Sequence, residues 1–75
     1  MRDADLRKQV GSAIRRLRQA RSLSQATLAK SAQLNRTYLT GVETGKRNLT
    51  LQTMSRLADA LGVRVSEFFQ DLNDP

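Results

Sequence analysis

The chain has 75 residues, with thirteen Lys plus Arg, seven Asp plus Glu, and neither Cys nor His. These counts exclude disulfides, thiolate or imidazole metal sites and the usual general base, and the length predicts a single domain over residues 1–75. No stretch is apolar enough to span a bilayer or to act as a secretory signal, so we expect a cytoplasmic protein without a cofactor.

The positive charge is concentrated in the first two thirds of the chain. Residues 1–21 hold seven cations and two acids, residues 22–50 four cations and one acid, and residues 51–75 two cations and four acids. The net charge of +6 predicts attraction to a polyanion, with nucleic acid the first choice and an anionic membrane the second. We expect the first two thirds to face the polyanion and the acidic last third to face away from it.

Apolar residues at helical spacing, N-capping residues and helix-ending glycines predict five helices. The first is marked by an apolar stripe, and Ser24, Asn35 and Thr50 are good N-caps for the next three. Gly45 is expected to end the third helix in a left-handed conformation. Nothing indicates a strand, so the sequence predicts a compact all-α fold. The predicted helices cover about residues 5–21, 24–32, 35–44, 50–61 and 66–72.

The second and third predicted helices are joined by residues 32–34 alone, which is typical of a helix-turn-helix. In this motif the second helix lies in the major groove of DNA. Leu39 and Val42 are expected to turn inward, and Gly41 to allow a close approach of the backbone to DNA or to a neighbouring helix. The remaining side chains can then reach base edges. They are Arg36, Thr37, Tyr38 and Thr40.

The stretches 23–29 and 34–49 resemble the lambda-repressor-like (Cro-type) helix-turn-helix family. Within them, the segments Asn-Arg-Thr-Tyr and Gly-Lys-Arg-Asn-Leu look most like the controller proteins of restriction–modification systems. The resemblance extends from about Val10 to Phe69. It implies a homodimeric transcription regulator that binds a palindromic operator in double-stranded DNA and either blocks or recruits RNA polymerase.

The resemblance also implies roles for individual residues. Gln25 matches a position that anchors the DNA backbone, and the exposed residues of the third helix match positions used for base and nearby phosphate contacts. Arg47 and Asn48 match a backbone or minor-groove contact. The expected DNA-binding residues are Gln25, Arg36, Thr37, Tyr38, Thr40, Lys46, Arg47 and Asn48.

Glu43 is the only acid in residues 22–50, where an unpaired carboxylate beside phosphate would oppose binding. The resemblance suggests Arg18 as its partner, in an ion pair that clamps the recognition helix onto the fold. Removing one member of such a pair would cost about 3 kcal/mol, because the other is left charged and unpaired.

Two positions depart from the family pattern. Gln33 stands where many members have Gly in the turn, and Ser22 where the first helix often ends with Gly. The departure predicts a positive φ at a residue other than glycine, at a cost of order 1 kcal/mol.

The C-terminal part is expected to contribute to dimerisation. Phe68, Phe69 and Leu72 are expected to be partly core, with at least one packing across the interface, and Leu51 also falls on a core stripe with Met54. The expected interface residues are Leu51, Val65, Phe68, Phe69 and Leu72.

Other classes of function are disfavoured by what the sequence lacks. It has no Gly-rich phosphate loop and no cluster of carboxylates, so we expect no enzymatic activity and no small-molecule ligand. The first helix has no aromatic anchor for a membrane, and the chain lacks the stacking aromatics of RNA-binding modules. The open alternatives are a phage or plasmid repressor, or an antitoxin-type interaction module that also binds DNA.

Overall fold

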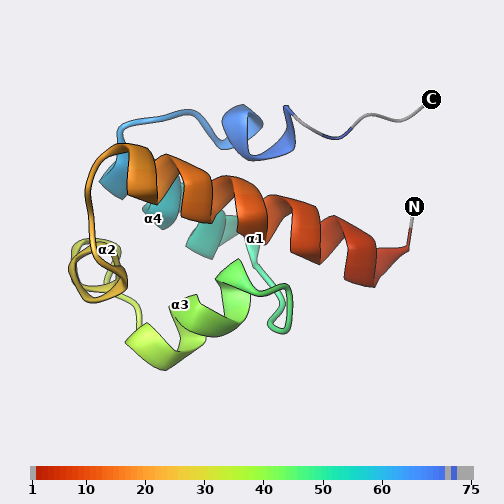
Figure 1. The fold of residues 1–75 in the computed structure, drawn as a ribbon, viewed down its shortest axis with the longest axis horizontal. Coiled ribbons are helices and arrows are strands. Elements are labelled where there is room, and N and C mark those ends of the chain that lie inside the picture. Colours follow the sequence, from red (N-terminus) through yellow and green to blue (C-terminus); the bar gives the residue numbers. More distant parts are fainter. Residues whose placement is uncertain (1, 71, 73–75) are drawn as a thin grey trace.

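In a computed structural model of the protein, which describes residues 2–70 and residue 72, four α-helices are followed by one 3₁₀ helix (Figure 1). The described residues contain no strand, as predicted. The elements are α1 (Asp3–Ala20), α2 (Gln25–Ser31), α3 (Arg36–Glu43), α4 (Leu51–Leu61) and the 3₁₀ helix η1 (Val65–Phe69).

A fifth α-helix was predicted over residues 66–72, of which residue 71 lies outside the described residues; in the described part this element is a 3₁₀ helix instead. It spans only five residues, and Glu67 N donates to Arg64 O at 2.9 Å in the i→i+3 pattern of a 3₁₀ helix. The Glu67 carboxylate also accepts from Arg64 N at 2.9 Å, which satisfies a backbone donor at the start of the segment. A helix of five residues can form few i→i+4 hydrogen bonds, and here the i→i+3 bonds of a 3₁₀ helix take their place.

Side-chain caps begin α2, α3 and α4 at the residues that the sequence predicted. Ser24 Oγ accepts from Thr27 N at 3.0 Å, and Thr50 Oγ1 accepts from Thr53 N at 3.0 Å. Asn35 Oδ1 accepts from two backbone donors in the first turn of α3, one of them Thr37 N at 2.7 Å. Each cap contributes about 1 kcal/mol, which matters most for the short helices α2 and α3.

Two tight turns place residues other than glycine in the left-handed region. Ser22 has φ 55° and Gln33 has φ 58°, which confirms the prediction for these positions. Each turn is closed by a backbone bond from the residue that follows, Leu23 N to Arg18 O at 3.1 Å and Leu34 N to Ala29 O at 2.7 Å. Glycine fills the corresponding positions after α3 and α4, with Gly45 at φ 77° as predicted.

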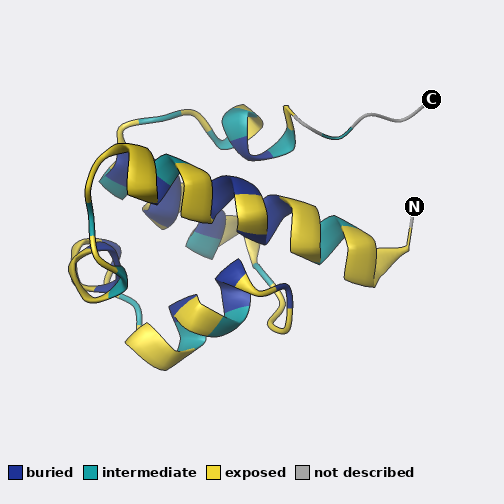
Figure 2. Ribbon diagram, in the orientation of Figure 1, coloured by how far each residue is buried: buried dark blue, intermediate teal, exposed yellow. Residues whose placement is uncertain are grey.

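The core lies where α1, α2, α3, α4 and η1 face one another, and each of the five elements contributes buried residues to it (dark blue in Figure 2). Phe68 is 1% exposed, so it belongs to the core of the subunit, and its assignment to a dimer interface is corrected. Leu51 is 80% exposed at the first position of α4, so it does not join Met54 in the core as the sequence predicted. The largest fully buried side chains are Phe68, Ile14, Leu28, Leu39, Leu57 and Val42.

α1 and α3 cross in backbone contact at Gly11. An ideal Cβ at this position would lie 2.1 Å from Val42 O and 3.0 Å from Glu43 O, distances that leave no room for any side chain. The C-terminal end of α3 is therefore seated directly on the middle of α1. None of the helices among the described residues is both long and apolar enough to cross a membrane.

Candidate nucleic-acid interface

α3 is fixed to the core along one side and presents the other to solvent, along the lower edge of Figure 1. Leu39 and Val42, 0% and 1% exposed, form the inner side, as predicted. Polar side chains with hydrogen-bond donors occupy the outer side, which is the arrangement needed to read base edges. Arg36, Thr37 and Thr40 are exposed, and Tyr38 is half-buried.

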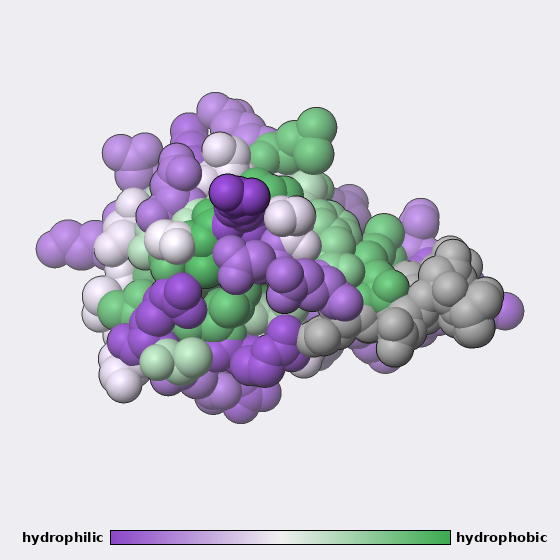
Figure 3. Space-filling model, turned by 90° about the horizontal axis from the view of Figure 1, so that it is seen from above, coloured by the Kyte–Doolittle hydropathy of each residue, from purple (hydrophilic) through white to green (hydrophobic). Residues whose placement is uncertain are grey.

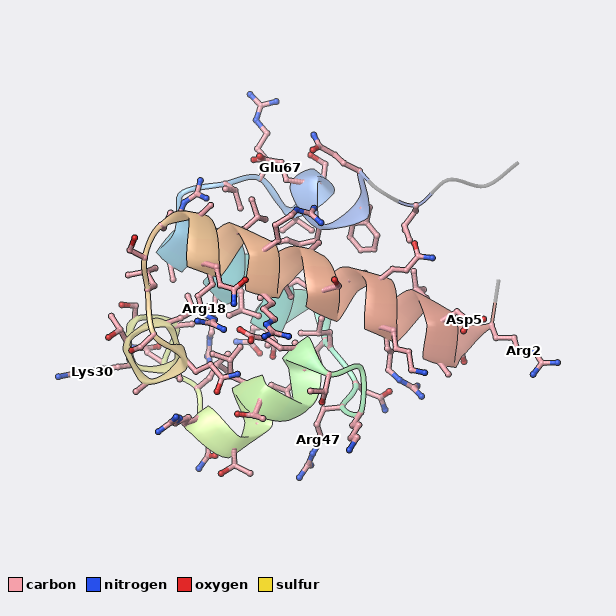
Figure 4. All side chains as sticks on the ribbon, in the orientation of Figure 1. Arg2, Asp5, Arg18, Lys30, Arg47 and Glu67 are labelled. Carbon is pink, nitrogen blue, oxygen red and sulfur yellow. The ribbon has the colours of Figure 1, made fainter. Side chains whose placement is uncertain are left out.

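A buried ion pair joins α1 to the end of α3. Arg18 Nε donates to Glu43 Oε2 at 2.7 Å, and Arg18 Nη2 donates to Glu43 Oε1 at 3.0 Å. The two side chains are 10% and 1% exposed, and Arg18 Nη1 also donates to Leu23 O at 2.8 Å. Figure 4 shows Arg18 extending from α1 toward α2 and α3. The guanidinium thus ties α1, the turn before α2 and α3 together.

Gln25 extends this network to the exposed side of α3. Its Nε2 donates to Glu43 Oε1 at 3.0 Å, while its Oε1 accepts from the Thr40 hydroxyl at 3.1 Å. The amide plane of Gln25 is therefore held at both ends by protein groups. This orientation connects the buried carboxylate to a residue that the sequence assigned to DNA contact.

A polar cleft of about 400 Å³ opens between α1, α2 and α3. Arg15 of α1 and Arg36 of α3, both exposed, line this cleft together, and Arg15 was not singled out from the sequence. The signal for Arg15 was its spacing from Arg18, because residues three apart share one face of a helix. The cleft is lined by Arg15, Arg18, Ser24, Gln25, Arg36, Glu43 and Thr44.

The loop between α3 and α4 is pinned at Asn48. Arg7 Nη1 donates to Asn48 Oδ1 at 3.1 Å, and the Tyr38 hydroxyl donates to Asn48 O. Asn48 and Tyr38, both assigned to DNA contact, thus also hold the loop in place, and Arg7 is a residue whose role the sequence did not indicate. Arg47 and Lys46 are exposed in this loop, and Arg47 extends outward on the α3 side of the molecule (Figure 4).

The part of the predicted dimer surface that belongs to η1 lies across the molecule, because η1 is on the opposite side of α1 from α3 in Figure 1. Seen from that side, hydrophobic residues reach the surface between hydrophilic ones (Figure 3). Val65, Phe69 and Leu72 are half-buried. An open hollow of about 240 Å³ adjoins this region, smaller than most ligand pockets. It is lined by Asp3, Leu6, Arg7, Val10, Asn48, Leu49, Met54 and Phe69. No group of acidic residues among the described residues is arranged to hold a metal ion.

The chain matches a known family and is similar to known proteins in sequence and fold. The helix-turn-helix family matches residues 14–68. Control protein C.MunI of Mycoplasma sp is 35% identical over 69 residues, which cover 91% of this chain and 93% of that protein. The immunity repressor of Bacillus phage phi105 is 42% identical over 57 residues, which cover 76% of this chain and 40% of the repressor.

A solved structure agrees with these sequence matches. The crystal structure of the restriction–modification controller protein C.AhdI from Aeromonas hydrophila is 45% identical and superimposes with a TM-score of 0.84. The superposition covers 88% of this chain and 98% of C.AhdI, so it includes almost every element described above. This chain therefore belongs to the helix-turn-helix family and is closely related to the controller proteins of restriction–modification systems.

Proposed function

We propose that this protein is a sequence-specific transcriptional regulator, the controller of a restriction–modification system, that binds a palindromic operator in double-stranded DNA as a homodimer. One observation carries the proposal: the ion pair between Arg18 and Glu43 and the Gln25 network hold α3 with its polar side outward. A rigidly held helix with exposed Arg36, beside a loop with exposed cations, suits insertion into the major groove.

The contacts divide into two kinds. Arg36, Thr37 and Thr40 face outward from α3 and are assigned to base edges and nearby phosphates. Lys46 and Arg47, in the loop after α3, are assigned to the DNA backbone. Arg15 joins them, because it shares the polar cleft with Arg36, where cations on both sides can approach one phosphate. Gln25, Tyr38 and Asn48 complete the surface and fix its shape.

Dimerisation is assigned to η1, to Leu72 beyond it, and to the start of α4. The residues proposed for the interface are Leu51, Val65, Phe69 and Leu72, which are exposed or half-buried. Leu51 is 80% exposed, and burying such a side chain contributes about 1.5 to 3 kcal/mol. A two-fold dimer would present two copies of α3 to successive major grooves about 34 Å apart, which requires a palindromic operator.

The single domain then both binds DNA and dimerises, and regulation needs no catalytic step. An occupied operator in the cytoplasm either blocks RNA polymerase or presents a surface that recruits it. The concentration of protein sets the occupancy if the dimer is weak, because dimerisation and DNA binding are then coupled. Occupancy plotted against total protein should be sigmoidal, and a hyperbolic curve well below the dimer dissociation constant would contradict this control.

The test is selection of bound duplexes from a random DNA library at physiological salt with nonspecific competitor. We expect a palindromic consensus with half-sites about one helical turn apart. If each subunit contacts three to four phosphates, the plot of log K against log salt should have a slope near −6, at about −0.9 per contact. Absence of enrichment, with binding that disappears as salt rises, would leave charge attraction alone and contradict the proposal.

Lys30→Ala provides the matched control for loss of charge. Lys30 is exposed on α2 and extends away from α3 in Figure 4. This variant should select the same consensus as the unaltered protein.

The position of the consensus in the genome separates the two kinds of regulator. A consensus before restriction and modification genes supports the controller, and one among phage genes supports a repressor like that of phi105. Copurification of a second protein would favour an antitoxin-type module.

A further inference from the structure

Gly41 occupies an unfavourable place for a glycine, in the interior of α3. The space that a side chain would fill is taken by Arg47. An ideal Cβ at Gly41 would lie 2.3 Å from Arg47 Cγ, and 3.4 and 3.5 Å from its Cβ and Cδ. The aliphatic part of the Arg47 side chain therefore lies directly on the α3 backbone at this residue.

The backbone of the loop is held at the same point. The Gly41 carbonyl oxygen accepts from Lys46 N at 2.8 Å and from Arg47 N at 3.2 Å. Gly41 thus fixes both where Arg47 leaves the chain and the direction in which its side chain runs. With its first carbons against α3, the exposed guanidinium extends outward on the α3 side of the molecule (Figure 4).

We infer that Gly41 is a positioning residue for DNA binding, which acts by seating the Arg47 side chain so that its guanidinium meets the DNA backbone beside α3. The inference rests on the proposed function. A methyl group at Gly41 would collide with Arg47 Cγ. The χ1 angle sets the position of this atom, so it cannot move aside without the rest of the side chain. Arg47 would have to change its χ1 rotamer, and the guanidinium, at the far end of the side chain, would then leave its place.

A double-mutant cycle on the selected operator duplex tests this assignment. Gly41→Ala should weaken binding about tenfold, as Arg47→Ala does, but should change affinity less than twofold in the Arg47→Ala background. Both single variants should also reduce the slope of log K against log salt by about 1.8, because each subunit then touches one phosphate fewer. Lys46→Ala is the control background, because it removes the neighbouring cation and leaves Arg47 in place. In this background Gly41→Ala should still weaken binding about tenfold.

Two results would overturn the inference. If Gly41→Ala weakens binding about tenfold in the Arg47→Ala background too, the methyl group itself obstructs DNA. An unchanged affinity in the otherwise unaltered protein would mean that Arg47 needs no such seat. Thermal unfolding distinguishes either from misfolding, because alanine favours a helix interior and should raise the melting temperature in the Arg47→Ala background.

A measurement without DNA separates this inference from the proposed function. In the free protein, the nuclear Overhauser effect between the Gly41 Hα and the Arg47 Hγ protons should be strong, and in Gly41→Ala the effect between residue 41 and Arg47 Hγ should disappear. If the unaltered protein binds no duplex, the proposed function fails whatever this result. If it binds and the Overhauser effect is absent, only the role of Gly41 fails.

Discussion

Glu43 at the end of α3 and Arg18 on α1 form a two-pronged ion pair, 25 residues apart in the chain, with N–O distances of 2.7 and 3.0 Å. The carboxylate accepts a third bond from Gln25 Nε2 at 3.0 Å. Both ionic groups are buried, so each depends on the other for compensation of its lost hydration. The orientation of α3 on α1 therefore depends on one carboxylate.

Glu43→Gln should lower the free energy of unfolding by about 3 kcal/mol. The amide keeps the size of the side chain but leaves the Arg18 guanidinium buried without a counter-charge. Operator affinity should fall as well, because α3 loses a hold on α1. Chemical denaturation measures the first effect and operator titration the second.

Asp59→Asn is the control for this change, since it removes the same charge from an exposed position on α4. It should alter the free energy of unfolding by less than about 0.5 kcal/mol. If Glu43→Gln lowers the free energy of unfolding no more than Asp59→Asn does, the ion pair does not stabilise the packing of α3 on α1.

Arg36→Ala should weaken binding to the selected operator by about 1 to 3 kcal/mol and leave a scrambled duplex of equal length much less affected. Arg36 is the exposed first residue of α3, and alanine suits this place, so the fold should persist. Fluorescence anisotropy with the two duplexes measures the difference. Equal losses on both would show that Arg36 contacts only the DNA backbone.

Gln33→Gly should stabilise the fold by up to about 1 kcal/mol, because glycine adopts the φ of 58° without steric cost. For a chain of this size that is a rise of several degrees in melting temperature. Gln9→Gly, at an exposed position within α1, should have the opposite sign and destabilise by about 0.5 to 1 kcal/mol. A melting temperature lowered by both substitutions would mean that the Gln33 turn is unstrained.

Leu51→Glu should weaken self-association about tenfold or more while leaving the subunit folded. Leu51 is 80% exposed, so its loss removes little from the core, and a carboxylate in the first turn of α4 interacts favourably with the helix dipole. Sedimentation equilibrium measures the dimer dissociation constant. Gln52→Glu places the same charge on the next residue, and a loss of association equal to that of Leu51→Glu would indicate charge repulsion instead of the removal of an apolar side chain.

Local features of this fold could be predicted because their causes lie within a few residues. The caps at Ser24, Asn35 and Thr50 follow from hydroxyl or amide oxygens placed just before helical spacing begins. The left-handed φ at Gln33 was expected because the resemblance places this residue where many family members have Gly in the turn. The inner side of α3, with Leu39 and Val42, follows from helical periodicity.

What escaped prediction depends on contacts between distant segments. Asn48 matched a DNA-contact position, yet its side-chain oxygen accepts from Arg7, 41 residues away, which no local pattern encodes. Leu51 fits the apolar spacing of α4 but stands at the end of the helix where no core reaches it. Phe68 and Phe69 are adjacent aromatics in the sequence, and only the path of η1 decides that Phe68 is the one inside.

The bare crossing at Gly11 has a mechanical consequence. Because the α3 carbonyls rest on the α1 backbone with no side chain between them, no rotamer change can absorb a tilt of one helix against the other. If the protein binds operators as proposed, it meets each of them with the same stiff shape, and the DNA duplex has to change its shape to fit. We expect affinity to vary with base pairs that the protein never touches, wherever flexible pyrimidine–purine steps make bending or groove narrowing easier.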